Sequence, residues 1–175
     1  MTSLIRTIRD WMHGTPKDAP LEYSQITDDL YIGAWPTKYN LDTIQSLGIT
    51  LVLSTILESV DKELGQPPLR LVKMRMSDAL PNRPYYPTKT LMRGVNAAMA
   101  AFDDGEKVMV FCKSGRHRSV TTACCILVGQ GYGAEEAISL VESKRPQADL
   151  NDALRKRIKS FEQAWREKNG RQTKD

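Results

Sequence analysis

Hydrophobic residues along the chain follow two spacings, one typical of buried strands and the other typical of amphipathic helices. Continuous aliphatic runs over 49–53 and 108–111 predict strands buried on both faces, as in a parallel sheet. Residues 69–76 alternate basic and apolar positions, which indicates an edge strand. Helical spacing predicts helices over 40–47, 88–102, 119–130, 134–144 and 151–168.

The segments between these elements indicate how they connect. Two short strand-like runs begin at Tyr23 and are joined by a turn at Asp28 and Asp29, which predicts a hairpin. Residues 59–68 predict a surface loop, and the prolines of 77–87 exclude regular structure there. We therefore expect an α/β fold with a central, mostly parallel sheet of about four to five strands flanked by helices.

Residues 1–14 carry apolar side chains at helical spacing and predict a short amphipathic helix. This helix either docks on its own domain, which we favour, or makes a peripheral membrane contact through Ile8 and Trp11. The predicted parts are a helix and linker over 1–20, one folded domain over 21–168 and a polar tail over 169–175.

The composition fits a single soluble domain. With 41% hydrophobic residues, a chain of 175 residues can bury one core of ordinary size. Cys124 and Cys125 are adjacent in an apolar helical pattern, so they predict core residues in a reducing, cytoplasmic compartment. No stretch has the length of a membrane span, and the N-terminus lacks the apolar core of a secretory signal.

The charge of the chain and its few potential metal ligands limit the classes of binding partner that we expect. The net charge of +4 and pI near 9.0 favour an anionic substrate or surface, unless the excess is only a solvated face. His13 and His117 are the only histidines, and no cysteine pair has the spacing of metal ligands. We expect a monomer without metal, cofactor or nucleic-acid partner.

The stretch 108–120 reads V-M-V-F-C-K-S-G-R-H-R-S-V and places Cys112 where a predicted strand passes into a predicted helix. Backbone N–H groups in such a loop, with the positive end of the helix, form a concave site for a tetrahedral dianion. The same donors lower the pKa of a thiol at their focus, which makes Cys112 a candidate thiolate. The planar guanidinium of Arg118 can clamp two phosphate oxygens.

The spacing Cys-x5-Arg-Ser resembles the signature loop of the cysteine-dependent protein tyrosine phosphatases, and residues 23–165 are similar to their dual-specificity branch. The resemblance implies that Cys112 attacks phosphorus and that Arg118 binds the phosphoryl group. It also implies that Ser119 helps the thiolate leave and that Asp78 protonates the leaving oxygen.

The sequence offers further candidate site residues. Weaker alternatives to Asp78 as the acid are Asp61, Asp103 and Asp104. Two aromatic residues of the proline-rich loop either line the substrate cleft or only anchor the loop, namely Tyr85 and Tyr86. The loop interior supplies the other predicted substrate-binding residues, which are Lys113, Ser114, Gly115, Arg116 and His117.

One position departs from the family pattern. Phe111 stands where the family usually has a histidine that orders the loop and helps to hold the thiolate. We therefore expect the loop to be less well supported and the pKa of Cys112 to lie closer to its ordinary value.

The resemblance implies a phosphomonoester hydrolase that dephosphorylates Tyr and Ser/Thr residues of proteins through a cysteinyl-phosphate intermediate. The basic side chains of Lys113, Arg116 and His117 support an alternative substrate, a phospholipid or other polyanionic small phosphate such as a phosphoinositide or phosphatidylglycerophosphate. A phosphate-binding pseudophosphatase is the third hypothesis.

Overall fold

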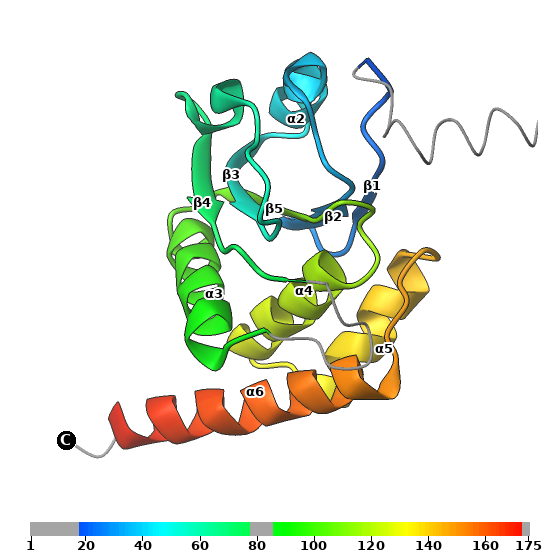
Figure 1. Ribbon diagram of the computed structural model, residues 1–175. Helices are drawn as coiled ribbons and strands as arrows, with labels where there is room; N and C mark the ends of the chain where they lie inside the picture. Colours follow the sequence, from blue (N-terminus) through cyan, green and yellow to red (C-terminus); the bar gives the residue numbers. More distant parts are fainter. Residues whose placement is uncertain (1–17, 78–85, 173–175) are drawn as a thin grey trace, which may run out of the picture.

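The computed structural model describes residues 18–77 and 86–172, with side chains up to residue 169. Five strands form one sheet in the order β1-β2-β5-β3-β4 (Figure 1). The strands are β1 (Tyr23–Gln25), β2 (Leu30–Gly33), β3 (Ile49–Ser54), β4 (Arg70–Lys73) and β5 (Lys107–Phe111). Only the β1–β2 pair is antiparallel among these neighbours, so the predicted mostly parallel sheet and the hairpin are confirmed.

Helices cover both faces of the sheet, but unequally (Figure 1). One face carries α2 (Leu41–Ser46). The other face carries α3 (Thr88–Asp103), α4 (Arg118–Gly129), α5 (Ala134–Lys144) and, farther from the sheet, α6 (Asp152–Gln172). Because α4 lies between the sheet and the other three helices of its layer, every residue from Arg118 to Val128 is buried.

Alternate residues of the central strand β5 belong to two separate cores. Val108 and Val110 pack with the layer of α3 to α6, whereas Met109 and Phe111 pack on the α2 side. Both sides of the strand are therefore apolar, as its continuous hydrophobic run predicts. The strand ends at the carboxyl edge of the parallel sheet, where ligand sites of α/β folds usually lie.

Two elements differ from their predicted form in the region between β2 and β4. The predicted helix over 40–47 is preceded by a 3-10 turn, η1 (Lys38–Asn40), because Thr37 makes the cap hydrogen bonds in place of Asn40. The predicted loop over 59–68 contains a second 3-10 turn, η2 (Lys62–Gly65). Its Leu64 is buried, so this loop adds to the core on the α2 side.

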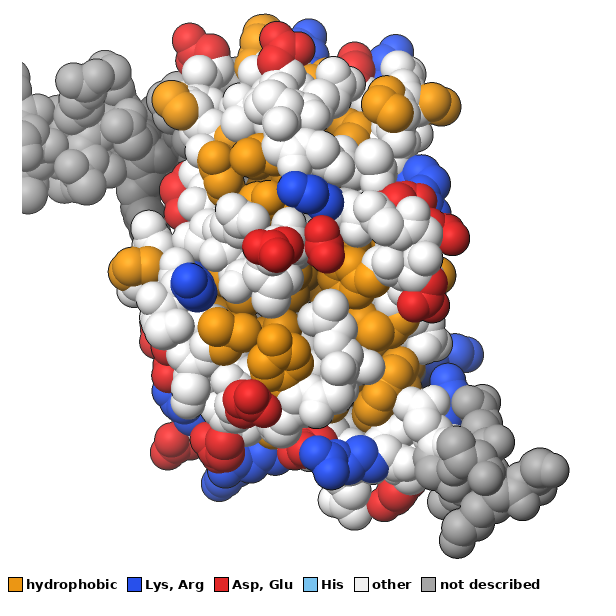
Figure 2. Space-filling view, turned by 180° about the vertical axis from the view of Figure 1, so that it is seen from behind, with side chains coloured by type: hydrophobic (Ala, Val, Ile, Leu, Met, Phe, Trp, Pro, Cys, Tyr) orange, Lys and Arg blue, Asp and Glu red, His pale blue; other side chains and the backbone are white. Residues whose placement is uncertain are grey.

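Several predictions concern residues outside the described ranges, namely the helix over 1–14, Asp78 and Tyr85. Within the described ranges, no helix is long and apolar enough to cross a membrane. Acidic and basic side chains are interspersed on the face shown in Figure 2. This distribution agrees with a solvated surface on that face more than with a patch of a single charge.

Candidate active site

Residues 112–117 connect the end of β5 to the first turn of α4. The loop therefore lies at the N-terminus of a twelve-residue helix, where the helix dipole favours an anion. Cys112 and Arg118 are 2% and 6% exposed, and Ser119 is fully buried. The structure thus brings together three of the four residues to which the sequence assigns a catalytic role.

The Cys112 sulfur accepts two hydrogen bonds from its own loop and helix. The Gly115 N–H lies 3.1 Å from Sγ, and the Ser119 hydroxyl lies 3.2 Å from it. Burial alone would raise the pKa of this thiol, but the Ser119 hydroxyl and N–H, the Arg118 charge and the Arg116 N–H together lower the pKa below its ordinary value. These contacts favour a thiolate, which is the form that acts as a nucleophile.

The segment that follows β4 holds the Arg118 guanidinium beside the loop. Nη1 of Arg118 donates to the Met76 carbonyl at 3.3 Å. The residue before Met76 is Arg75, whose φ of 54° lies in the left-handed region that non-glycine residues seldom adopt. After this turn the Met76 N–H donates to the Thr55 carbonyl at 2.9 Å, so the segment that leads into Asp78 starts next to the catalytic loop.

Thr55 supports the strand end at the position where the family pattern has its histidine. The carbonyl of Phe111 accepts the Thr55 N–H at 3.1 Å and the Thr55 hydroxyl at 2.8 Å. Phe111 itself is buried in the core on the α2 side. Thr55 thus supplies support at the strand end that no pattern around Phe111 reveals. That the loop is less well supported than is usual in the family stays a prediction.

The connection between α5 and α6 holds the far side of the loop through two residues that the sequence analysis missed. Arg145 donates from Nε to the Gly115 carbonyl at 2.5 Å. The Asp149 N–H donates to the Arg116 carbonyl at 3.1 Å. In the sequence, Arg145 looks like an ordinary cation at a helix end, so nothing there points to a contact with a loop 30 positions earlier.

Asp149 also offsets part of the positive charge of the loop. Its carboxylate lies 3.2 Å from Nε2 of His117 and 3.7 Å from Nη2 of Arg116. Lys113 is exposed and forms no ion pair within the described residues. The excess positive charge at the mouth of the loop is therefore smaller than the sequence indicates.

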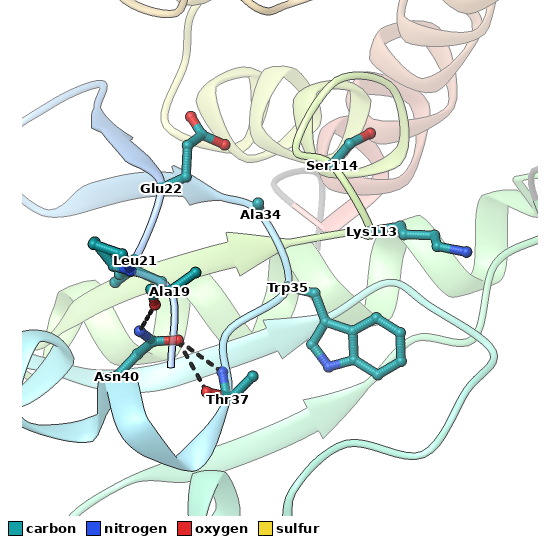
Figure 3. A pocket seen from close by; sticks show the side chains of 10 residues that line it. Ala19, Leu21, Glu22, Ala34, Trp35, Thr37, Asn40, Lys113 and Ser114 are labelled. Atoms are coloured by element: carbon teal, nitrogen blue, oxygen red, sulfur yellow. Dashed lines mark hydrogen bonds between the residues drawn. The ribbon is translucent and has the colours of Figure 1, made fainter. Parts of the chain in front are cut away.

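A hollow of about 310 Å³ lies beside Lys113 and Ser114 (Figure 3). Asn40 and Trp35 also line it, and the Trp35 backbone N–H donates to the Lys113 carbonyl at 3.3 Å. The Asn40 side chain is held in place because it donates to the Ala19 carbonyl and accepts the Thr37 N–H, both at 2.9 Å. The hollow gives room for groups attached to a phosphate ester bound in the loop.

The remaining predicted residues take different positions. Ser114 and Arg116 are exposed on the loop, and Gly115 is buried. Tyr86 is only 2% exposed and packs in the core of the α3 to α6 layer, so its role as a cleft wall is corrected to that of a loop anchor. Its carbonyl accepts a hydrogen bond from Arg157 of α6 at 2.7 Å. No group of three or more potential metal ligands occurs in the ranges that the structure describes.

A family model described as "Dual specificity phosphatase, catalytic domain" matches residues 30–164. The mouse protein "Dual specificity phosphatase 28" is 26% identical over 152 residues, which cover 86% of this chain and 90% of that protein. The fold is similar to that of a mouse putative dual specificity phosphatase complexed with zinc tungstate, with a TM-score of 0.72, 23% identity, and 89% of this chain and 96% of that chain covered. PTPMT1 in complex with PI(5)P gives a TM-score of 0.73 at 21% identity, with 84% and 98% of the two chains covered.

Proposed function

Because the chain belongs to the dual specificity phosphatase catalytic-domain family and is a cysteine-dependent protein phosphatase, we propose that Cys112 is its nucleophile. The observation that carries this proposal is the set of donors around the Cys112 sulfur, which lowers the pKa of a thiol that burial alone would keep neutral. Arg118 and the loop N–H groups bind the phosphoryl oxygens, where charge develops in the transition state.

The reaction proceeds in two displacements. The Cys112 thiolate attacks phosphorus, a sulfur–phosphorus bond forms, and the oxygen of the substrate leaves with its electron pair and takes a proton. Water then attacks the cysteinyl-phosphate, releases inorganic phosphate and restores the thiolate. The Ser119 hydroxyl, 3.2 Å from Sγ, stabilises the sulfur as its negative charge returns in this second step.

Asp78 is the proposed acid for the leaving oxygen and the proposed base for the attacking water. The support is that Met76, two positions earlier, already contacts Arg118 through its carbonyl. Asp78→Asn should slow the hydrolysis of alkyl phosphates by about 10²- to 10⁴-fold and should slow aryl phosphates less, because a phenolate needs less help from a proton. Equal losses for both substrates, in a comparison of kcat, would remove Asp78 from this role.

A phosphorylated protein is the substrate that the site supports best. Asp149 pairs with Arg116 and lies beside His117, so one carboxylate offsets part of the positive charge that a second anionic group would meet at the loop. The structural neighbour solved with PI(5)P keeps a phospholipid as the second candidate, although at 21% identity that likeness concerns the fold. Parallel turnover assays with phosphotyrosine peptides, phosphothreonine peptides and phosphoinositides distinguish the two substrates.

We also propose that the protein is a cytoplasmic monomer and that its residues 1–14 dock on the domain or on a membrane surface.

Cys112→Ser tests the proposal directly. The variant should lose hydrolysis of p-nitrophenyl phosphate to background, because a neutral hydroxyl without a nearby base is a far poorer nucleophile than a thiolate. It should keep its melting temperature and its binding of inorganic phosphate. Cys125→Ala is the matched control, since it removes another buried thiol and should retain turnover. Activity of Cys112→Ser close to that of the wild type would exclude Cys112 as the nucleophile.

A further inference from the structure

Arg145 is the fully buried arginine that joins three separate segments of the chain. Besides the bond from Nε to Gly115, its Nη1 donates to the Ser24 hydroxyl at 3.1 Å. Its Nη2 donates to the Glu22 carboxylate at 2.9 Å. Glu22 directly precedes β1, and Ser24 is its middle residue. A buried charge held by this many partners is costly to lose and well placed to fix geometry.

The bond from Arg145 to Gly115 sets the direction of a neighbouring N–H group. The Gly115 carbonyl and the Arg116 N–H belong to one peptide unit, and in a trans peptide these two groups point in opposite directions. Because Arg145 holds the carbonyl on the side of the loop away from the Cys112 sulfur, the Arg116 N–H is directed toward that sulfur. There it is one of the donors that lower the pKa of Cys112.

Gly115 makes this peptide unit easy to rotate and therefore in need of a restraint. Its φ of 65° lies in the left-handed region, and glycine crosses between backbone conformations at little cost. A Cβ at this position would run into the Arg145 guanidinium and come within 2.8 Å of the Gly33 carbonyl oxygen. The rotated peptide would turn its carbonyl oxygen toward the thiolate and the phosphate oxygens, where it would repel both.

We propose that Arg145 is a positioning residue of the phosphate loop, which holds the peptide between Gly115 and Arg116 with its N–H toward the nucleophile and transfers this restraint to Glu22 and Ser24. The proposal rests on the phosphate-binding function proposed above for the loop. It adds a residue that touches neither the substrate nor the reacting atoms. Arg145 acts on the loop through its hydrogen bond to the Gly115 carbonyl.

The charged groups around the loop show how the positioning role of Arg145 differs from a general electrostatic role. Arg118 lies next to the thiol on the α4 side, and Asp149 pairs with His117 and Arg116 on the outer side. Arg145 faces Glu22, so the pair as a whole brings little net charge to the loop. Losing Arg145 alone removes one positive charge as well as the restraint on the peptide, so Arg145→Lys, which keeps the charge and loses the fork, is needed to separate the two effects.

Alkylation of Cys112 by iodoacetamide as a function of pH tests the proposal, with inorganic phosphate as the protecting ligand. Arg145→Met should raise the midpoint of the alkylation profile by about half a pH unit or more, because one donor to the thiolate is no longer held. It should weaken protection by phosphate about tenfold, the usual effect of losing a hydrogen bond to a charged group. Arg145→Lys should shift the alkylation midpoint and weaken phosphate protection by smaller amounts. The lysine ammonium can replace one of the three hydrogen bonds that the guanidinium makes, but not all of them.

Arg155→Met is the matched control. Arg155 also donates from Nε to a backbone carbonyl, that of Leu150, and from Nη2 to a glutamate, Glu142, but it does not contact the loop. This variant should keep the alkylation midpoint and the phosphate constant of the wild type. The Glu22 side chain is 43% exposed, so water can solvate its carboxylate once Arg145 is replaced.

A purely structural role for Arg145 predicts a different result. A folded Arg145→Met with a lower melting temperature but an unchanged alkylation midpoint and phosphate constant would overturn the proposal. If Arg145→Met does not fold, Arg145→Lys decides by the same two readouts, and wild-type values there overturn the proposal. Alkylation requires no substrate, so these results are independent of the Cys112→Ser test. An active Cys112→Ser would defeat the proposed function, whatever the Arg145 variants show.

Discussion

The structure buries three cysteines to nearly the same depth, but their surroundings shift the pKa of the thiol in opposite directions. The three are Cys112, Cys124 and Cys125. Cys112 is 2% exposed, and Cys124 and Cys125 are fully buried. Burial raises the pKa of Cys125, and burial with the nearby charges of Cys125 and Glu142 raises the pKa of Cys124. At Cys112 the same penalty of burial is outweighed by hydrogen-bond donors and the Arg118 charge, so the pKa falls.

The opposite pKa shifts follow from the backbone N–H groups near each thiol and not from how deeply the thiol is buried. Cys112 lies before the first turn of α4, where N–H groups have no partner within the helix. Cys124 and Cys125 lie in the middle of that helix, where the backbone donors bond to carbonyls of the preceding turn. The Cys124 thiol donates a weak hydrogen bond to the Ala137 carbonyl at 3.9 Å and otherwise packs in the hydrophobic core. One helix thus carries a reactive cysteine before its start and inert cysteines in its interior.

Selective labelling gives the largest expected difference between the two regions. In the folded protein at pH 7, iodoacetamide should modify Cys112 at least about 10³-fold faster than Cys124 or Cys125, because each unit of pKa difference changes the thiolate fraction tenfold. Peptide mass spectrometry after timed quenching measures the three rates. In denaturant the three rates should become similar, and similar rates in the folded protein would contradict the comparison.

Alkaline pH should weaken the fold through the interior pair. Their raised pKa values keep both thiols protonated in the folded state, whereas the unfolded chain ionises them above about pH 8.5. Below that pH the two thiols make their full contribution to the free energy of unfolding. As the pH rises toward the folded pKa values, this contribution declines by about 1.4 kcal/mol per pH unit for each thiol. Urea unfolding from pH 8 to 10 should therefore show a steeper loss for the wild type than for Cys124→Ala/Cys125→Ala. Parallel losses would show that these thiols do not couple to folding.

Ser119→Ala should make Cys112 more like the interior cysteines. The variant removes the hydroxyl that contributes most to lowering the pKa, so alkylation at pH 6 should slow by about three- to tenfold. The sign follows from the direction of the shift, since a higher pKa leaves less thiolate at any pH below it. Thr121→Val is the control, because the Thr121 hydroxyl is buried in the same turn and has no hydrogen-bond partner in the described structure. An effect of similar size in both variants would assign the change to packing instead.

The sequence predicts the strands and helices well because they depend on local periodicity. The run over 108–111 and the helix over 134–144 match β5 and α5 closely, since burial on two faces and an amphipathic stripe both leave a clear pattern. Long-range contacts leave no such pattern. Arg145 and Asp149 are separated from the catalytic loop by α4, a turn and α5, so their role becomes visible only when α5 has folded back.

The effect of Phe111 shows the same limit in one residue. A missing histidine predicts a thiol closer to its ordinary pKa than is usual in the family, and the structure adds that the pKa of Cys112 is lowered even without that histidine. The reason is that the donors are the Ser119 hydroxyl and N–H, the Arg118 charge and the Arg116 N–H, none of which depends on the side chain at 111. Thr55, from a different strand end, replaces the support for the backbone.

The complete burial of α4 links the lifetime of the catalytic site to that of the whole domain. Amide hydrogens that are bonded within a helix enclosed by a sheet and three other helices exchange with solvent only when the surrounding structure opens, so we expect Thr121 to Val128 to be among the slowest-exchanging residues. Arg118 and Ser119 begin the same buried helix, and the Ser119 hydroxyl donates to the Cys112 sulfur. Inactivation by heat should therefore coincide with global unfolding.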